Sequence, residues 1–210
     1  VEEYLGNQHD VTLQIGKSKG VNEYEEIQER QNIWVNEALR KAENDNDVNW
    51  LFHIDADEIL KGDLNKVQEL PDSVRTFWFQ NEEAKFDKVP QKTDSCFSAS
   101  TLTDCSKEPK NCVSYGNGKG CGRVAPDVLA NGPHRMKSTK KENTDEKMDV
   151  IKLEHYESCD FDIFKEKFKH LAVQDKKSTI PFAYYNESIN AAKDNDDNAL
   201  YKIYEKYRVT

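Results

Sequence analysis

The stretch Asn49–Lys61, NWLFHIDADEILK, decides how the fold is interpreted, because it ends a run of apolar residues in three carboxylates. Trp50–Ile54 has the apolar and aromatic content of a buried β-strand. Asp55, Asp57 and Glu58 follow directly. Carboxylates at the end of a buried strand cost free energy unless a cation or hydrogen-bond donors compensate their charge. The stretch therefore predicts a strand whose end carries a functional site.

The segments around this stretch predict alternating strands and helices. Val11–Ile15 and Val74–Gln80 are rich in β-formers, and apolar residues recur at helical spacing through Glu23–Glu43. A strand, a helix and a second strand in this order form a βαβ unit, which pairs its strands in parallel. We therefore expect a single α/β domain over residues 1–210, with a Rossmann-like, mixed but mainly parallel sheet flanked by helices.

The second half of the chain is less periodic. Residues 82–122 are rich in Lys, Asp, Ser and Cys and predict a loop-rich excursion that includes at most a hairpin. Gly116–Gly122, GNGKGCG, predicts a mobile or sharply turned loop. The remaining expected elements are a strand over Val150–His155, an amphipathic helix over Phe161–Val173, and a C-terminal helical segment over residues 188–210 that is interrupted at Asp194–Asn198.

Composition argues against two classes of protein. The net charge of −9 does not suit a nucleic-acid-binding protein, because phosphate binding needs a basic surface. No apolar run is long enough to span a membrane. A phosphorylated small molecule stays compatible with this charge, because one bound divalent metal reverses the local field. We expect a cytoplasmic protein, although a chain that starts at Val1 leaves an upstream start, a targeting segment and further domains open.

The cysteines leave the redox compartment open. Local disulfides and free thiols in a reducing cytosol are both compatible with their number. The sequon Asn186-Glu187-Ser188 does not decide, because so short a match is common by chance. No pair has the C-x-x-C spacing of a zinc site, so a structural zinc is not favoured. The five residues are Cys96, Cys105, Cys112 and Cys121 in one stretch and Cys159 apart from them.

Asp55 and Asp57 are the first candidates for metal ligands. They lie two apart, so in an extended chain both side chains point to the same side. Two like charges at that separation repel unless a cation lies between them, and Mg²⁺ or Mn²⁺ prefers oxygen ligands and keeps positions open for phosphate. Ligands of open α/β sheets bind at the carboxyl ends of the strands. The alternative is that these acids cap the start of a following helix.

The segment Arg30–Leu60, RQNIWVNEALRKAENDNDVNWLFHIDADEIL, resembles the D-x-D region of metal-dependent GT-A glycosyltransferases. It is similar to small enzymes of the family-2-like and related groups, including ones encoded by large algal viruses. The likeness is specific over residues 24–60 and moderate over residues 123–170. It implies a GT-A fold, Mn²⁺ or Mg²⁺ as cofactor, and transfer of a sugar from a nucleoside-diphosphate donor, of the UDP-sugar kind, to a hydroxyl group of a glycan or another acceptor.

The resemblance also implies roles for single residues. Asp55 and Asp57 would bind the metal and through it the diphosphate, and Asp55 would also touch the ribose. Glu58 would orient the loop. Leu153–Ser158, LEHYES, resembles a late strand end whose histidine is the third metal ligand, here His155. The alternative for His155 is a partly buried histidine on a strand.

Basic residues are the further candidates for contact with the donor or the acceptor. An exposed basic loop is the alternative for two of them, His134 and Arg135, and Arg30 has an ion pair with Glu26 at i,i+4 as its alternative. The Gly-rich loop would form a lid over the donor or the acceptor. The full set that the resemblance implies is Arg30, His134, Arg135, Lys165 and Lys167.

The general base, the nucleotide and the stereochemistry are left open by the sequence. Glu82, Glu83 and Asp87 follow the strand after the D-x-D motif and are candidates for the carboxylate base of an inverting enzyme. GT-A domains begin with a strand and a loop that grips the nucleobase, whereas the first ten residues, VEEYLGNQHD, resemble the helix that follows that strand. The identity of the nucleotide is therefore not predicted.

Two other functions compete with sugar transfer. A phosphatase or phosphotransferase of the haloacid dehalogenase type also has a strand that ends in D-x-D, with a later pair of aspartates that would be Asp196-Asp197 here. That motif normally lies in the first strand, unlike the one in this chain. A non-catalytic carbohydrate-binding domain is the third possibility, because aromatic residues such as Tyr184 and Tyr185 can stack on sugars.

Overall fold

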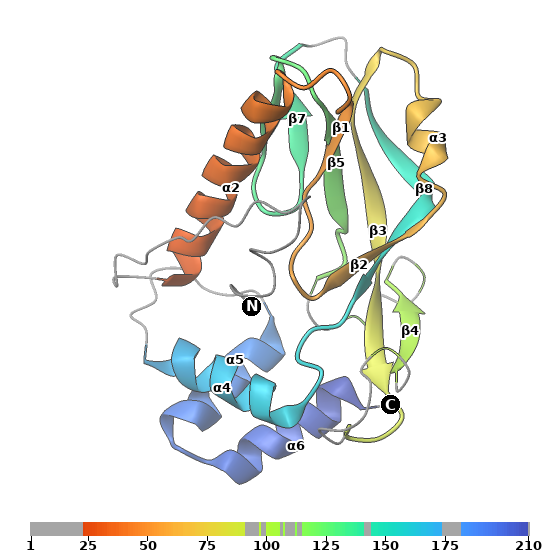
Figure 1. Cartoon of the computed structure of the whole chain (residues 1–210). Helices are drawn as coiled ribbons and strands as arrows, with labels where there is room; N and C mark the ends of the chain where they lie inside the picture. Colours follow the sequence, from red (N-terminus) through yellow and green to blue (C-terminus); the bar gives the residue numbers. More distant parts are fainter. Residues whose placement is uncertain are drawn as a thin grey trace, which may run out of the picture.

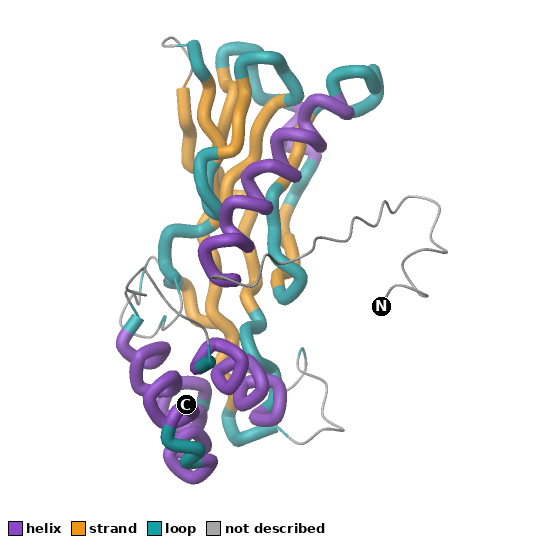
Figure 2. The backbone as a smooth tube through the Cα atoms, turned by 90° about the vertical axis from the view of Figure 1, so that its left-hand side faces the viewer, coloured by secondary structure: helices purple, strands orange, loops and turns teal. Residues whose placement is uncertain are grey.

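The computed structural model describes residues 23–90, 97, 100–105, 107, 112, 115–140, 144–173 and 182–209. The predicted strand Val11–Ile15 lies outside these residues. In Figure 1, helices α4, α5 and α6 gather at one end of the molecule, and helix α2 lies beside the other end of a long sheet. Figure 2 shows α2 crossing one face of that sheet. The described chain is therefore a mixed α/β structure, as its periodicity predicts.

The elements follow the predicted order closely. The helix predicted over Glu23–Glu43 and the strands predicted before Asp55, after Val74 and before Tyr156 are all present, and the C-terminal segment is a helix pair. In chain order the elements are α2 (Glu23–Ala42), β1 (Trp50–Phe52), β2 (Glu58–Gly62), α3 (Asn65–Gln68), β3 (Val74–Phe86), β4 (Ser100–Asp104), β5 (Lys119–Arg123), β6 (Val128–Ala130), β7 (Met136–Ser138), β8 (Thr144–His155), α4 (Phe161–Ala172), α5 (Ala183–Lys193) and α6 (Asp197–Arg208).

The sheet is mixed, and a mainly parallel, Rossmann-like arrangement is not confirmed. Its strand order is β1-β5-β3-β8-β2, with β4 added beside β3, and β6 pairs with β7 separately. Among the described strands only β3 and β8 pair in parallel, and the other pairs are antiparallel. Strands β1 and β3 run in the same direction, but β5 lies between them. The sequence gave no sign of this inserted strand, and the parallel partner predicted for β1, Val11–Ile15, lies outside the described residues.

Strand β5 comes from the Gly-rich segment, so the prediction of a lid there is wrong for Lys119–Arg123. This strand has few β-formers, but its glycines make room for the β6–β7 hairpin that crosses it. A Cβ atom on Gly120 would lie 2.9 Å from the Cα atom of Arg135, and one on Gly122 would lie 2.6 Å from Val128 Cγ1. Gly118 makes the turn before the strand with a φ of +64°. Backbone approach therefore explains Gly120, and close side-chain packing explains Gly122.

The predicted loop-rich excursion contains the expected hairpin and a disulfide. Strand β3 continues to Phe86 and pairs antiparallel with β4. Cys105 and Cys112 form a disulfide directly after β4, and Cys159 is disulfide-bonded as well. Cys121 is a buried free thiol on β5. Because disulfides persist in oxidising compartments and are rare in the cytosol, the bonded cysteines argue against the expected cytoplasmic location.

The described residues form three apolar clusters. One lies under the sheet and includes Phe77, Phe79 and Leu153. A second joins α4, α5 and α6 through residues such as Phe164 and Tyr204. The third packs α2 on the β6–β7 hairpin. A local signal also fixes the start of α4, because Asp160 caps it by accepting a hydrogen bond from Ile163 N at 2.8 Å. None of the helices in the described part of the chain is both long and apolar enough to cross a membrane.

Candidate functional site

The DADE turn joins β1 to β2, and Glu58 holds it in shape. Glu58 Oε2 accepts a hydrogen bond from the backbone N–H of Asp55 at 2.6 Å, and the hydroxyl group of Tyr115 donates to Glu58 Oε1. Burial is the largest effect on Glu58 and raises the pKa of its carboxyl. Glu58 is thus placed where it can orient the loop, as the resemblance implies. The alternative that the acids cap a helix is wrong, because the next element is strand β2.

Asp55 is compensated by a buried lysine that the sequence did not reveal. The ammonium group of Lys119 lies 2.6 Å from Asp55 Oδ2 and donates to the carbonyl of Pro133 at 3.1 Å. The side chain of Lys119 is fully buried, and its ammonium also lies 3.7 Å from Glu58 Oε2. Gln31 Nε2 of α2 donates to Asp55 Oδ1 at 3.0 Å. Asp55 is therefore already neutralised and oriented by protein groups.

Asp57 faces His155, which is the pairing that the resemblance implies. The backbone N–H of Tyr156 donates to the carbonyl of Asp57 at 2.9 Å, which fastens the DADE turn to the end of β8. Asp57 Oδ2 lies 3.8 Å from His155 Nε2. The parallel register of β3 and β8 places Glu83 beside His155, and Glu83 Oε2 lies 3.1 Å from His155 Nδ1. The imidazole therefore lies between two carboxylates.

The electrostatics of His155 follow from these neighbours. Burial alone lowers the pKa of His155, but the charge of Glu83, the hydrogen bond to it, and the charges of Glu157 and Asp57 outweigh burial and raise the pKa to about 8. A proton on the ring thus has the effect that a metal cation would have, because its positive charge reduces the repulsion between Asp57 and Glu83. His155 is only 5% exposed, so this proton is held inside the protein.

Glu83 is anchored in turn by the last residue of α6. Arg208 Nη1 donates to Glu83 Oε1, and both side chains are fully buried. Burial would raise the pKa of Glu83, but the charges of His155 and Arg208 and the hydrogen bond to His155 lower it. Glu83 therefore stays ionised and acts as a fixed acceptor for His155.

A second buried carboxylate, Glu157, follows β8. Its oxygens accept from Lys167, from the hydroxyl group of Tyr184 at 2.5 Å and from that of Tyr185 at 2.9 Å. Burial would raise the pKa of Glu157, but Lys167, His155 and Arg208 hold it well below the usual range. Lys167 is thereby held at the wall of the site by a carboxylate that keeps its charge.

These groups surround a cavity of about 200 Å³. Five of the residues predicted from the sequence line it, namely Asp55, Asp57, His134, His155 and Lys167. His134 contributes a neutral ring, because burial and the charge of Lys119 lower its pKa to about 4. The other lining residues are Ile27, Gln28, Gln31, Tyr115, Pro133, Glu157, Phe182 and Tyr185. The structure thus brings together the D-x-D motif, LEHYES and the segment around His134.

The other predicted basic residues do not line this cavity. Arg30 lies 3.6 Å from Glu26, which is the ion pair that was its alternative. The guanidinium of Arg135 stacks on Trp78, with its Cζ atom 4.6 Å from the ring centroid. Lys165 pairs with Asp197 at 3.2 Å on the helical side of the molecule. The donor contacts proposed for these three residues stay predictions without support from their placement.

Of the three candidates for the general base, only Glu83 lies next to the site. Glu82 points to the opposite face of β3 and pairs with Lys152. Asp87 lies beyond the end of β3, where Thr101 donates to it at 3.5 Å. Glu83 is committed to His155 and Arg208, and its lowered pKa makes it a weak proton acceptor. Its position suits an orienting role.

The donor set fits a divalent metal only in part. Within the described residues no group of three His, Cys, Asp or Glu side chains is placed to hold a metal ion. Asp57 and His155 form a two-ligand edge, and Glu83 supplies the carboxylate that usually lies behind a metal-binding histidine. Asp55 is engaged by Lys119, so it would bind a metal only after leaving that ammonium.

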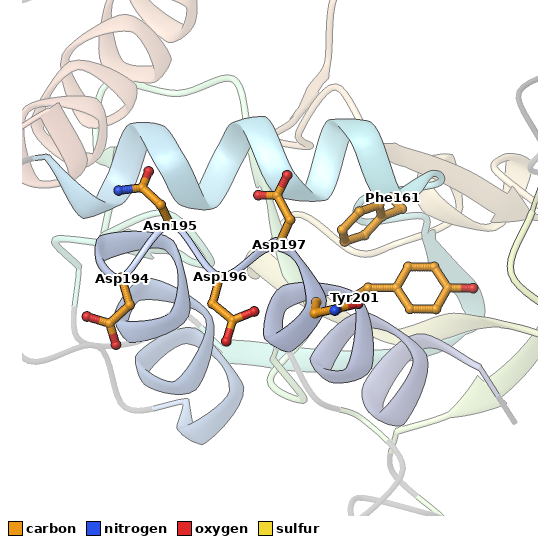
Figure 3. A pocket seen from close by; sticks show the side chains of 7 residues that line it. Phe161, Asp194, Asn195, Asp196, Asp197 and Tyr201 are labelled. Atoms are coloured by element: carbon orange, nitrogen blue, oxygen red, sulfur yellow. The ribbon is translucent and has the colours of Figure 1, made fainter.

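The Asp196-Asp197 pair lies at the start of α6, away from the cavity that Asp55 and Asp57 line. Asp196 caps α6 by accepting from Ala199 N at 2.9 Å, and Asp197 pairs with Lys169 at 2.9 Å. Figure 3 shows both in the α5–α6 turn, where they line a separate cavity with Phe161 and Tyr201. A phosphatase of the haloacid dehalogenase type would need this pair beside Asp55. The described structure keeps the two acidic motifs in different cavities.

Sequence reasoning found the site residues that belong to local motifs and missed those that enter by sheet pairing. Lys119 and Tyr115 come from the segment that the sequence predicts as a loop, and the motif LEHYES by itself does not indicate a role for Glu157. The sequence signal for Lys119 is its position between Gly118 and Gly120, where a single charged residue stands among glycines that allow close packing. The chain matches no protein-family model, no curated protein and no solved structure. Its function is therefore argued from the geometry of the site.

Proposed function

We propose that the protein transfers a sugar from a nucleoside-diphosphate donor to a hydroxyl acceptor, with Mn²⁺ or Mg²⁺ held by Asp57 and His155. The observation that supports this most is the Asp57–His155–Glu83 arrangement. A carboxylate and an imidazole from different elements face each other at 3.8 Å, and the second ring nitrogen is taken by a buried carboxylate. That arrangement is typical of metal-binding histidines, whose other nitrogen is fixed by a hydrogen bond.

The residues of the cavity have distinct tasks in this proposal. The metal, when bound, stabilises the negative charge that develops on the departing diphosphate. Asp57 and His155 hold it, and Glu83 keeps the His155 ring in orientation. Lys119 and Gln31 fix Asp55 at the side of the cavity next to α2. Lys167, held by Glu157, offers a cation for a phosphate oxygen.

The proposal assigns no general base. The pKa values of Glu83 and Glu157 are both lowered, and both carboxylates already accept hydrogen bonds from buried donors. Neither is therefore suited to accept a proton. Glu82 and Asp87 point away from the cavity. The stereochemistry of transfer therefore stays open, and the nucleotide and the sugar do too.

A thermal-shift experiment tests the proposal. Mn²⁺ together with UDP or another nucleoside diphosphate should raise the melting temperature of the wild-type protein, because a ligand that binds only the native state stabilises it by mass action. The variant Asp57→Asn should lose this shift. The matched control is Asp149→Asn, since Asp149 is an exposed residue of β8 that pairs with Lys147.

Three results would contradict the proposal. One is an Asp57→Asn protein that responds to Mn²⁺ and nucleoside diphosphates as the wild type does. Another is metal-dependent cleavage of a generic aryl phosphate, which would indicate a phosphatase. The third is affinity for glycans without Mn²⁺ and without turnover, which would indicate a carbohydrate-binding domain.

A further inference from the structure

A second cavity, of about 330 Å³, lies against the first one. Asp57, Glu157 and Lys167 line both cavities, so these three residues form a common wall. The residues that line only the second cavity come from the DADE turn, the start of β2, the connection between β3 and β4, the segment after β8 and the first turn of α4. They are Ala56, Glu58, Ile59, Phe97, Tyr156, Ser158, Cys159 and Ile163.

The second cavity is apolar on the side away from the common wall. The rings of Phe97 and Tyr156 meet edge to face, with their centroids 4.9 Å apart. Ile59 and Ile163 add aliphatic surface. Ile163 is 55% exposed although it is a large apolar residue, and Phe97 is 61% exposed. A cavity with an apolar lining and a few convergent polar groups is the usual form of a small-molecule site.

The charges of this cavity select against an anionic ligand. Glu58 and Glu157 are both ionisable and are satisfied inside the protein, by Asp55 N and Tyr115 in one case and by Lys167 and two tyrosines in the other. Asp57 adds a negative charge at the common wall, and Lys167 is the cation of the lining. Glu58 is also compensated by Lys119, 3.7 Å away. Glu157 holds Lys167, so the lining offers a phosphate or carboxylate no cation that is not already paired. A neutral ligand with hydroxyl groups meets no such penalty.

We propose that the second cavity binds the acceptor, and that the acceptor is a neutral glycan. This inference rests on the proposed function. The apolar face of a pyranose ring would lie against Tyr156, Phe97 and Ile163, and a ring hydroxyl would reach the common wall at Asp57 and Lys167. The volume is near the lower end of the range for small-molecule sites and suits about one or two sugar rings.

In the proposed transfer step, the acceptor hydroxyl group in the second cavity attacks the donor sugar at the common wall. The acceptor hydroxyl oxygen forms a new bond to the anomeric carbon of the donor sugar. The bond between that carbon and the diphosphate oxygen breaks, and its electron pair leaves with the nucleoside diphosphate. The hydroxyl proton of the acceptor is released to solvent. The two cavities meet at one wall, so donor and acceptor can be bound on either side of the reacting bond.

Ile163 gives a sharp test, because it is exposed on α4 and only its backbone N–H serves the helix cap. Ile163→Trp should fill the cavity and weaken binding of neutral methyl glycosides by roughly tenfold or more, and Ile163→Ala should weaken it less. Saturation-transfer NMR with a panel of neutral mono- and disaccharide methyl glycosides measures this. The matched control is Val173→Trp, because Val173 directly follows the same helix, is 83% exposed and does not line the cavity.

The same proteins separate this inference from the proposed function. The shift in melting temperature with Mn²⁺ and UDP should be the same in Ile163→Trp as in the wild type. If that shift is present but no neutral glycan binds, or if binding is unchanged in Ile163→Trp, the acceptor site is refuted and the donor site stands. Binding of anionic sugars or of detergent micelles in preference to neutral glycans also refutes it. If glycans bind in an Ile163-dependent way and the shift is absent from the wild type, the proposed function fails instead.

Discussion

Single residues answer why a buried strand ends in so much negative charge. Lys119 compensates Asp55 and Glu58, and the proton on His155 lies between Asp57 and Glu83. Both cations are buried, so each interaction is screened less by water than a surface pair would be. The charge at the strand end is thus balanced in the absence of a metal, and a metal would compete with a proton on His155.

Lys119 should be essential for stability. Lys119→Met removes the ammonium and leaves Glu58, whose side chain is fully buried, beside Asp55 without compensation. Breaking a buried ion pair from one side costs about 3–5 kcal/mol, and urea denaturation measures the loss. The double variant Lys119→Met/Asp55→Asn should recover part of it, because one of the two negative charges is then gone. A loss below about 1 kcal/mol would refute this role.

His155 should make the metal-free protein less stable as pH rises. Its pKa is raised to about 8 in the folded protein from an ordinary value of 6.5, so the folded state binds more protons between these values. The stabilisation is complete below pH 6.5 and is lost as pH passes through 8. The groups that face the ring are Asp57, Glu83, Glu157 and Tyr115. The expected loss is up to about 2 kcal/mol.

Unfolding by urea at a series of pH values, with chelator present, checks this dependence. His155→Gln should remove most of the slope between pH 6.5 and 8.5. His134→Gln is the control, because the pKa of His134 is lowered to about 4 in the folded state, so its ring affects stability mainly below pH 7. A wild-type protein whose stability is flat or rises over the window would contradict the assignment.

At the scale of elements, helix α6 supports the site from a distance. Its last residue, Arg208, is the buried partner of Glu83, which in turn fixes His155. The helix itself begins with the Asp196 cap and packs its apolar face on α4 and α5. A change at the end of α6 should therefore reach Asp57 and His155, the proposed metal ligands.

Arg208→Gln should both destabilise the protein and weaken its response to Mn²⁺. The substitution leaves Glu83 buried with one cationic partner fewer, at a cost of about 3 kcal/mol or more. Lys206→Gln is the matched control, because Lys206 lies on the same helix in an exposed pair with Glu187 and should change stability by less than about 0.5 kcal/mol. Urea denaturation and the Mn²⁺-induced thermal shift measure the two effects. An unchanged Mn²⁺ response would limit Arg208 to a structural role.

The elements also show what the sequence can and cannot predict. The long helices and strands β1, β3 and β8 follow from periodicity, whereas the sequence does not predict β2, β6 and β7. Asp55 and Asp57 follow from the motif at a strand end, and His155 follows from the resemblance. Strand β5 is not predicted by periodicity, because GNGKGCG lacks β-formers. Its glycines are instead required by the close packing of the hairpin that crosses the strand. Neighbours in a sheet are set by contacts between distant segments, so the insertion of β5 between β1 and β3 and the arrival of Lys119 at Asp55 could not be predicted locally.

The whole molecule places its two cavities where the sheet and the helical cluster meet. β8 ends at His155, the chain turns through Glu157, and α4 then presents Lys167 to both cavities. The parallel β3–β8 pair brings Glu83 to this junction, and α6 brings Arg208. A site at this junction depends on the packing of β3, β8, α4 and α6. Substitutions that loosen these elements should therefore lower global stability and ligand binding together.

The disulfide after β4 should contribute to global stability and link folding to an oxidising environment. Cys105 and Cys112 are seven residues apart, and closing so short a loop stabilises the folded state by about 2 kcal/mol in the chain-entropy model. Cys105→Ser alone and Cys105→Ser/Cys112→Ser should therefore lose the same amount in urea denaturation, because either change breaks the bond. Reductant should lower the stability of the wild type by at least this amount, since Cys159 is disulfide-bonded too. Equal stability with and without reductant would refute the stabilising role of the disulfide.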